Sequence, residues 1–126
     1  MKNVLILMAF VISFTAYGQE IELAAKALSD GNVETLTSLF DETVEVCIED
    51  DLDLLDKKEA KAKIEGFFKV NTPKSFTRKH KGDSKGKDSQ YVIGDLTTST
   101  SNYRVYLYFG NVKGKKKIQE IRLDKL

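Results

Sequence analysis

The sequence predicts an α+β domain in which three helices pack on one face of an antiparallel sheet. Residues 19–70 show mainly helical patterns, interrupted by one short strand or hairpin. Residues 74–126 show strand patterns separated by polar and glycine-rich turns. Helices followed by a run of strands are typical of the α+β class, in which the helices cover one face of the sheet. No internal repeat or linker divides the chain, so we expect a single domain over residues 19–126.

Residues 1–18 have the features of a secretory signal peptide. A basic residue, Lys2, precedes an apolar run from Val4 to Phe14, and the small residues Ala16 and Gly18 occupy the positions expected at a cleavage site. A helix that spans a membrane needs about 20 apolar residues, so this run is too short for a stable membrane anchor. We therefore expect cleavage after Gly18 and a mature protein that is periplasmic or extracellular.

The charged residues and the single cysteine exclude several classes of function. The chain has 20 basic and 19 acidic residues, and loss of Lys2 with the leader makes the two numbers equal. A protein without net positive charge has no general attraction for nucleic acid or an anionic membrane. Cys47 is the only cysteine and His80 the only histidine, so we expect neither an internal disulfide nor a four-ligand zinc site. The composition therefore predicts no metal and no nucleic-acid partner, and because the chain has no P-loop or dinucleotide fingerprint we expect no cofactor.

The clearest helix covers Asp56–Val70. Asp56 and Glu59 have the spacing of a capping box, in which each side chain bonds the backbone N–H of the other residue. We expect Asn71 to end the helix in a left-handed conformation, and Pro73 prevents the helix from continuing. Four apolar residues recur at helical spacing and should pack into the hollow of the sheet: Ala60, Ile64, Phe67 and Phe68.

Two shorter helices and a strand precede it. The helices are expected over Glu20–Leu28 and Val33–Phe40, joined by Gly31 in a left-handed conformation and by the N-cap Asn32. Residues Thr43–Glu49 alternate between apolar and polar side chains, which predicts a half-buried strand. An acidic turn and a short partner strand, Leu52–Leu55, then lead into the long helix.

Four strands are expected after Pro73. They cover Lys74–Lys81, Ser89–Thr98, Tyr103–Asn111 and Lys117–Leu126. Gly94 interrupts the second of these strands and predicts a bulge or bend. The spacing of Ile118 and Ile121 breaks the two-residue alternation of the last strand, so we expect another bulge there.

Several short segments support a closer resemblance. They are Gly31-Asn32, Phe67-Phe68, His80-x-Gly82, Tyr91-x-Ile93-Gly94, Tyr103-Arg104-Val105 and Ile118-Gln119-Glu120-Ile121. In order and spacing they resemble a small exported family from Bacteroidetes, the domain of unknown function 4783. The order of elements is also similar to the nuclear transport factor 2-like (NTF2-like) cone of the cystatin-like folds, shared with ketosteroid isomerase and polyketide cyclases. This resemblance implies three helices packed on a curved antiparallel sheet.

The resemblance covers nearly all of residues 19–126 but implies no particular reaction. The small family has no assigned activity. Enzymes of the wider superfamily carry acid and base groups inside the cone, yet no motif in this chain matches their pair of a tyrosine and a protonated aspartate.

His80 is the first candidate for a catalytic group. Histidine titrates near neutral pH and commonly acts as a general base. Its strand places it on the same side as Phe76 and Arg78, and if that side faces the cone, Tyr91 or Asp95 from the next strand would assist it. The alternative is a structural histidine that bonds the backbone or a carboxylate.

Aromatic and basic residues suggest a ligand site. The candidates are Phe67, Phe68, His80, Tyr91, Arg104 and Tyr106. Tyrosines could line an apolar pocket with their hydroxyl groups directed inward, although aromatic residues are also ordinary constituents of strands. Arg104 would hold a ligand carboxylate or pair with Asp95 or Glu120 across the sheet.

The strand Tyr103–Asn111 is apolar on both faces. Val105, Leu107 and Phe109 alternate with Arg104, Tyr106 and Tyr108. A strand with apolar residues on both faces is covered on both faces, and the helices cover only one. We therefore expect a homodimer in which two sheets pack against each other.

Three functions fit these observations. The first is an exported, non-catalytic module that binds a small ligand or another envelope protein. The second is a small enzyme of the isomerase, hydratase or cyclase kind with His80 as base. The third is a structural interaction domain whose sheet is the interface. An open cavity that contains His80, Tyr91 or Asp95 would favour the first two, and a cone filled by Phe67, Phe68 and tyrosines would favour the third.

Overall fold

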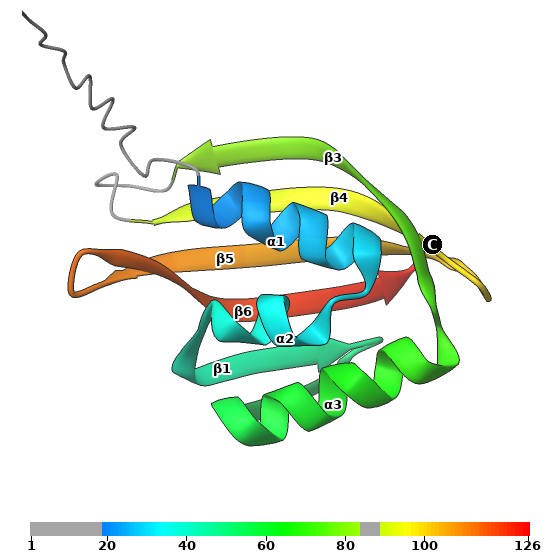
Figure 1. Ribbon diagram of the computed structural model, residues 1–126, viewed down its shortest axis with the longest axis horizontal. Helices are drawn as coiled ribbons and strands as arrows, with labels where there is room; N and C mark the ends of the chain where they lie inside the picture. Colours follow the sequence, from blue (N-terminus) through cyan, green and yellow to red (C-terminus); the bar gives the residue numbers. More distant parts are fainter. Residues whose placement is uncertain (1–18, 84–88) are drawn as a thin grey trace, which may run out of the picture.

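The computed structural model describes residues 19–83 and 89–126 (Figure 1). The expected signal peptide lies outside the described residues. The described chain forms three helices and six strands in the predicted order. Their bounds are α1 Gln19–Asp30, α2 Val33–Ser38, β1 Phe40–Ile48, β2 Asp51–Asp56, α3 Lys57–Val70, β3 Pro73–Asp83, β4 Gln90–Thr98, β5 Asn102–Val112 and β6 Lys115–Lys125.

All six strands belong to one curved sheet in the order β2-β1-β6-β5-β4-β3 (Figure 1). β3 to β6 form the predicted antiparallel meander, and β1 and β2 form an antiparallel hairpin. The expectation of an entirely antiparallel sheet is corrected at one place, because β1 and β6 run parallel. These two strands are not consecutive, so no tight turn between them imposes an antiparallel arrangement.

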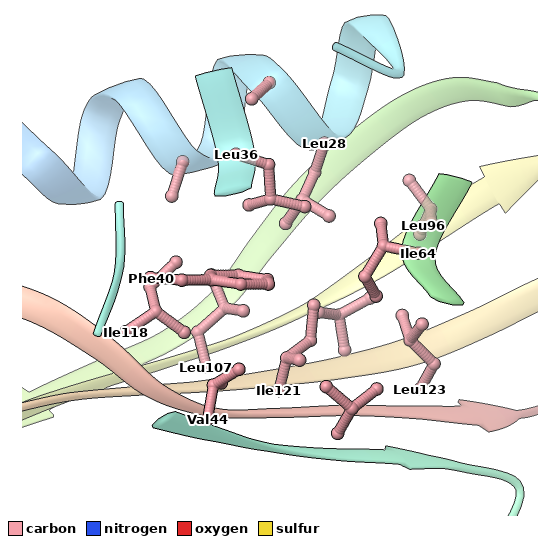
Figure 2. Close-up of a cluster of buried hydrophobic side chains, with 14 of the residues drawn as sticks. Leu28, Leu36, Phe40, Val44, Ile64, Leu96, Leu107, Ile118, Ile121 and Leu123 are labelled. Carbon is pink, nitrogen blue, oxygen red and sulfur yellow. The ribbon is translucent and has the colours of Figure 1, made fainter. Parts of the chain in front are cut away.

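The three helices cover one face of the sheet (Figure 1). α1 packs on β3, and α3 packs on β1 and β2. The space between the two layers is filled by a cluster of buried side chains, shown in Figure 2. Its fully buried members come from helices and strands alike and include Leu28, Leu36, Phe40, Val44, Ile64, Leu96, Leu107, Ile118, Ile121 and Leu123.

α3 begins and ends at the predicted residues. The Asp56 side chain accepts a bond from the Glu59 backbone N–H at 2.8 Å, and the Glu59 side chain accepts one from the Asp56 N–H at 3.2 Å, which confirms the capping box. Asn71 does not adopt the expected left-handed conformation, since its φ is −119°. Its side chain instead satisfies the helix end, because Nδ2 donates to the Phe67 carbonyl at 3.0 Å. Gly31 does take the left-handed conformation, with φ of 69°.

Two of the register shifts in the sheet lie at or near the predicted bulges. The predicted bulge in β6 is confirmed, because Ile118 pairs with Phe109 and Glu120 with Tyr108, which leaves Gln119 as the extra residue. Near Gly94 the irregularity lies in the neighbouring strand β3, where Arg78 pairs with Gly94 and His80 with Ile93. Gly94 itself is required by close packing, since a Cβ atom there would lie 2.5 Å from the Phe76 ring.

Candidate functional site

The sheet has one face covered by helices and one face that is not. We call the second one the outer face, and its side chains follow from the register of the strands. Paired residues point to the same side, so three rows of side chains cross the outer face. The first row is Leu52, Cys47, Arg122, Tyr106, Ile93 and His80; the second is Leu54, Glu45, Glu120, Tyr108 and Tyr91; the third is Asp124, Arg104, Asp95 and Thr77.

Tyrosines occupy the middle of the outer face. Tyr91 is paired with Tyr108 and Ile93 with Tyr106 across β4 and β5. The rings of Tyr91 and Tyr106 are stacked, with centroids 6.3 Å apart and planes 21° apart. All four side chains are half-buried in the single chain. Burial raises the pKa of the Tyr106 hydroxyl, and the nearby Glu120 carboxylate adds to this effect, so Tyr106 stays neutral.

Charged residues surround this tyrosine cluster. Arg104 Nε donates to Asp95 Oδ1 at 2.6 Å, which confirms the expected pairing with Asp95. Lys79 Nζ lies 4.0 Å from Asp95 Oδ2 on the β3 side. Arg122 Nη1 lies 3.6 Å from Glu120 Oε2 on the β6 side. The outer face therefore carries acidic and basic groups close together on both sides of its aromatic centre.

Cys47 is buried on the outer side of the sheet. It is 2 % exposed and lies in register between Leu52 and Arg122. The Cys47 sulfur is the largest cause that raises the pKa of Arg122. Arg122 is therefore in register with a buried free thiol.

His80 lies on the opposite side of the sheet from Phe76 and Arg78, which corrects the expected placement. Lys79 is the extra residue of the β3 bulge, so the alternation of side chains shifts by one residue after Arg78. Arg78 consequently reaches α1, where its Nη1 bonds Glu22 Oε2 at 2.8 Å, while His80 joins Ile93 on the outer face. His80 is exposed.

The six ligand-site candidates are divided between the two faces. Phe67 and Phe68 lie on the helix side, at 9 % and 6 % exposure, and the Phe67 ring meets the Tyr103 ring edge-on at 5.0 Å. The other four, His80, Tyr91, Arg104 and Tyr106, lie on the outer face. The sheet separates the two groups, so the six residues do not form one site. The catalytic candidates His80, Tyr91 and Asp95 do share the outer face, outside the cone.

Neither a metal site nor a membrane-spanning helix is found in the described residues. Within 19–83 and 89–126 no group of three or more His, Cys, Asp or Glu side chains is arranged to hold a metal ion. In the same part of the chain, no helix has the length and apolar character needed to cross a membrane.

The sequence interpretation missed two features of the surface. Leu52 and Leu54 of β2 are 55 % and 68 % exposed on the outer face. The alternation of aspartate and leucine in Asp51–Leu54 was the signal that could have identified an edge strand with one apolar side. The second feature is a hollow between α1 and β3. No sequence pattern could have predicted it, because the residues that line it are distant from one another in the sequence.

Comparison with known proteins places the chain in a family. The model of the family described as domain of unknown function, DUF4783, matches residues 21–124. This chain belongs to the DUF4783 family. A search among curated proteins found no match.

Solved DUF4783 structures have the same fold. A family protein from Bacteroides uniformis is 31% identical, with a TM-score of 0.79 over 83% of this chain and 95% of that one. A family protein from Bacteroides fragilis is also 31% identical, with a TM-score of 0.78 over 82% of this chain and 96% of that one. An NTF2-like protein from Cytophaga hutchinsonii is 12% identical, with a TM-score of 0.63 over 88% of this chain and 96% of that one, and shows the shared fold alone. The expected family and the NTF2-like cone are both confirmed.

Proposed function

We propose that this DUF4783 protein is an exported, non-catalytic module that binds protein through the outer face of its sheet. Its partner on that face is a second copy of the chain. The main support is a difference between the two sides of the sheet: the helix side is filled, and the outer face carries aromatic and charged side chains.

The helix side is filled by the protein's own side chains. Phe67, Phe68 and Tyr103 pack together in the core, at 9 %, 6 % and 4 % exposure. The fully buried leucine, isoleucine and valine side chains of Figure 2 occupy the rest. A small-ligand site or an active site is normally a concave pocket with a few polar groups directed into it. The filled cone favours an interaction domain over either of these.

The outer face has the composition of an interface. Interface centres are enriched in tyrosine and arginine and are surrounded by polar groups. Here Tyr91, Tyr106 and Tyr108 form the centre, and Arg104 and Arg122 flank it. Leu52 and Leu54 extend the apolar area toward β2.

The charges on this face suit a second copy of the same chain. A two-fold dimer brings one patch against itself, so the patch must be complementary to itself. Glu120 and Arg122 are neighbours on β6, and Arg104 and Asp95 are neighbours across β5 and β4. A two-fold rotation can place each arginine of one copy beside a carboxylate of the other.

The dimer is tested by placing a charge at the centre of the outer face. We expect Tyr106→Arg to weaken self-association at least about tenfold, because loss of a central aromatic contact in an interface costs about 2 kcal/mol or more. Val70→Arg is the matched control: it introduces the same side chain at a 69 % exposed position at the end of α3, and association should be unchanged.

Native mass spectrometry and sedimentation of the purified protein give the measurement. A monomer at high protein concentration would contradict the dimer. A bound small molecule that co-purifies with a monomer would instead favour the ligand-binding module.

Export is tested on the full chain with its own leader. We expect the mature protein to begin at Gln19, found by mass spectrometry of the periplasmic or secreted fraction, since residues 1–18 have the pattern of a cleaved signal peptide. A charge within the apolar run, Ile6→Arg, should leave the uncleaved protein inside the cell. Retention of residues 1–18 on exported protein would show that the segment is not removed.

An enzyme with His80 as base is the alternative function. A general base must lie within hydrogen-bond distance of the proton that it removes, in a site that also holds the substrate. His80 is exposed, and Asp95 Oδ1 already accepts a hydrogen bond from Arg104 Nε at 2.6 Å. These contacts favour a structural pairing over an acid–base pair.

A further inference from the structure

β3 forms one edge of the sheet and is long. It spans Pro73–Asp83 and, among the described residues, pairs only with β4. An edge strand carries backbone N–H and C=O groups that another strand can bond. α1 runs beside this edge on the covered face (Figure 1). Arg78 of β3 bonds Glu22 of α1 there.

A hollow of about 340 Å³ lies between α1 and β3. Phe76, Ala25 and Ser29 line it, together with two ion pairs: Arg78 with Glu22 at 2.8 Å and Lys26 with Asp30 at 3.0 Å. Phe76 is half-buried and packs against the core. A strand added to β3 would direct every second side chain to this face. An apolar side chain at those positions would contact Phe76 and Ala25.

The opposite side of β3 is basic. Lys79 and His80 are exposed and lie toward the outer face. Lys79 is only 4.0 Å from Asp95, which is already bonded to Arg104. The ion pairs of the described chain leave His80 without an acidic partner. An added strand would therefore gain from acidic side chains on this face.

We propose that β3 accepts an extended segment of a partner protein as an additional strand. The segment alternates apolar residues, which enter the hollow beside α1, with acidic residues, which face Lys79 and His80. Main-chain bonds to β3 supply affinity in this mode of recognition, and the alternate side chains supply specificity. The β3 edge shares Lys79 and His80 with the rim of the outer face, whereas the hollow beside α1 lies on the covered face, away from the tyrosines at the dimer centre.

Lysines on an edge strand also have a protective role, because they discourage pairing with other chains. The two roles predict opposite results. An edge that is only protected rejects every peptide, whereas an edge that recognises acidic strands binds them and rejects basic ones.

Fluorescent peptides test the proposal. One peptide of about eight residues, long enough to span a strand, alternates Glu and Val. A second alternates Lys and Val, and a third has the first sequence with a central Pro, which cannot pair as a strand. We expect the Glu-Val peptide to bind, by fluorescence anisotropy, at least tenfold more tightly than the other two. Hydrogen exchange of β3 backbone amides should slow on binding.

Two variants locate the site, and a third serves as the control. Lys79→Glu with His80→Glu removes the basic side, and Ser29→Trp fills the hollow; each should weaken Glu-Val binding at least tenfold. Lys113→Glu, at an exposed lysine in the β5–β6 turn, is the matched control and should bind normally. Circular dichroism checks that each variant is folded. Failure of the Glu-Val peptide to bind, equal binding of all three peptides, or binding without protection of β3 would overturn the proposal.

Discussion

At the residue scale, Asn71 connects the end of α3 to the β4–β5 turn and to β5. It is 8 % exposed, and both its backbone N–H and its Nδ2 donate to the Phe67 carbonyl, at 2.8 and 3.0 Å. Its Oδ1 accepts from the Tyr103 hydroxyl at 3.3 Å and from the Thr100 hydroxyl. One amide therefore satisfies the end of a helix, a buried tyrosine and the turn before β5.

Asn71→Ala should lower the free energy of unfolding by about 1–3 kcal/mol, because buried partners are left without hydrogen bonds. Urea denaturation measures the change. Asn102→Ala, at an exposed position that begins β5, is the control and should change the free energy by less than about 0.5 kcal/mol. Equal effects of the two substitutions would show that the Asn71 contacts do not stabilise the fold.

At the element scale, α3 follows β2 directly in the chain and is also held to it by ion pairs. Lys63 of α3 bonds Asp53, and its Nζ lies 3.4 Å from Asp51 Oδ2. The Lys63 side chain is 23 % exposed. The bond to Asp53 is the largest cause that raises the pKa of Lys63 above 10.5. The charge pair orients the edge strand β2 against the helix that follows it.

This pair predicts how stability depends on alkaline pH. A lysine with a raised pKa in the folded protein stabilises the fold fully below its unfolded pKa of 10.5, and the contribution is lost as the pH rises through the folded value. Lys63→Gln should thus lower the free energy of unfolding by roughly 0.5–1 kcal/mol at neutral pH.

The difference between Lys63→Gln and the unsubstituted protein should shrink above pH 10.5. Urea denaturation at neutral and alkaline pH measures it. Lys58→Gln, on the exposed side of α3, serves as the control with little change at either pH. A difference that persisted at alkaline pH would assign the effect to packing rather than charge.

At the scale of the whole molecule, the last strand lies in the middle of the sheet. β6 pairs with β5 on one side and, in parallel, with β1 on the other. Ile118, Ile121 and Leu123 of β6 are fully buried. The C-terminus therefore holds the hairpin β1–β2 and the meander together.

Removal of residues 115–126 should abolish folding. Burial of three such side chains contributes about 5–9 kcal/mol, which is comparable to the whole stability of a domain of this size. Near-ultraviolet circular dichroism and dispersion of NMR signals would show the loss. Removal of Leu126 alone, which is 62 % exposed, should leave the fold intact. A folded product after the larger deletion would show that β1 and β5 can form the core without β6.

The sequence by itself determined the features that neighbouring residues control. Asp56 and Glu59 fix the start of α3, Gly31 permits the turn between α1 and α2, and Ile118 and Ile121 reveal the β6 bulge. Caps, turns and alternation depend on groups a few residues apart, so they can be read directly. These features, with the order of helices and strands, were sufficient for the fold class.

Only the tertiary structure decided which residues share a face. The Lys79 bulge moved His80 away from Arg78, and pairing of β1 with β6 made the sheet mixed. Strand register and pairing between distant segments are set by the packing of the whole core, and a shift of one residue moves every later side chain to the other face. For this reason the aromatic residues predicted as one site lie on both sides of the sheet, with Phe67 and Phe68 in the core and Tyr91 and Tyr106 on the outer face.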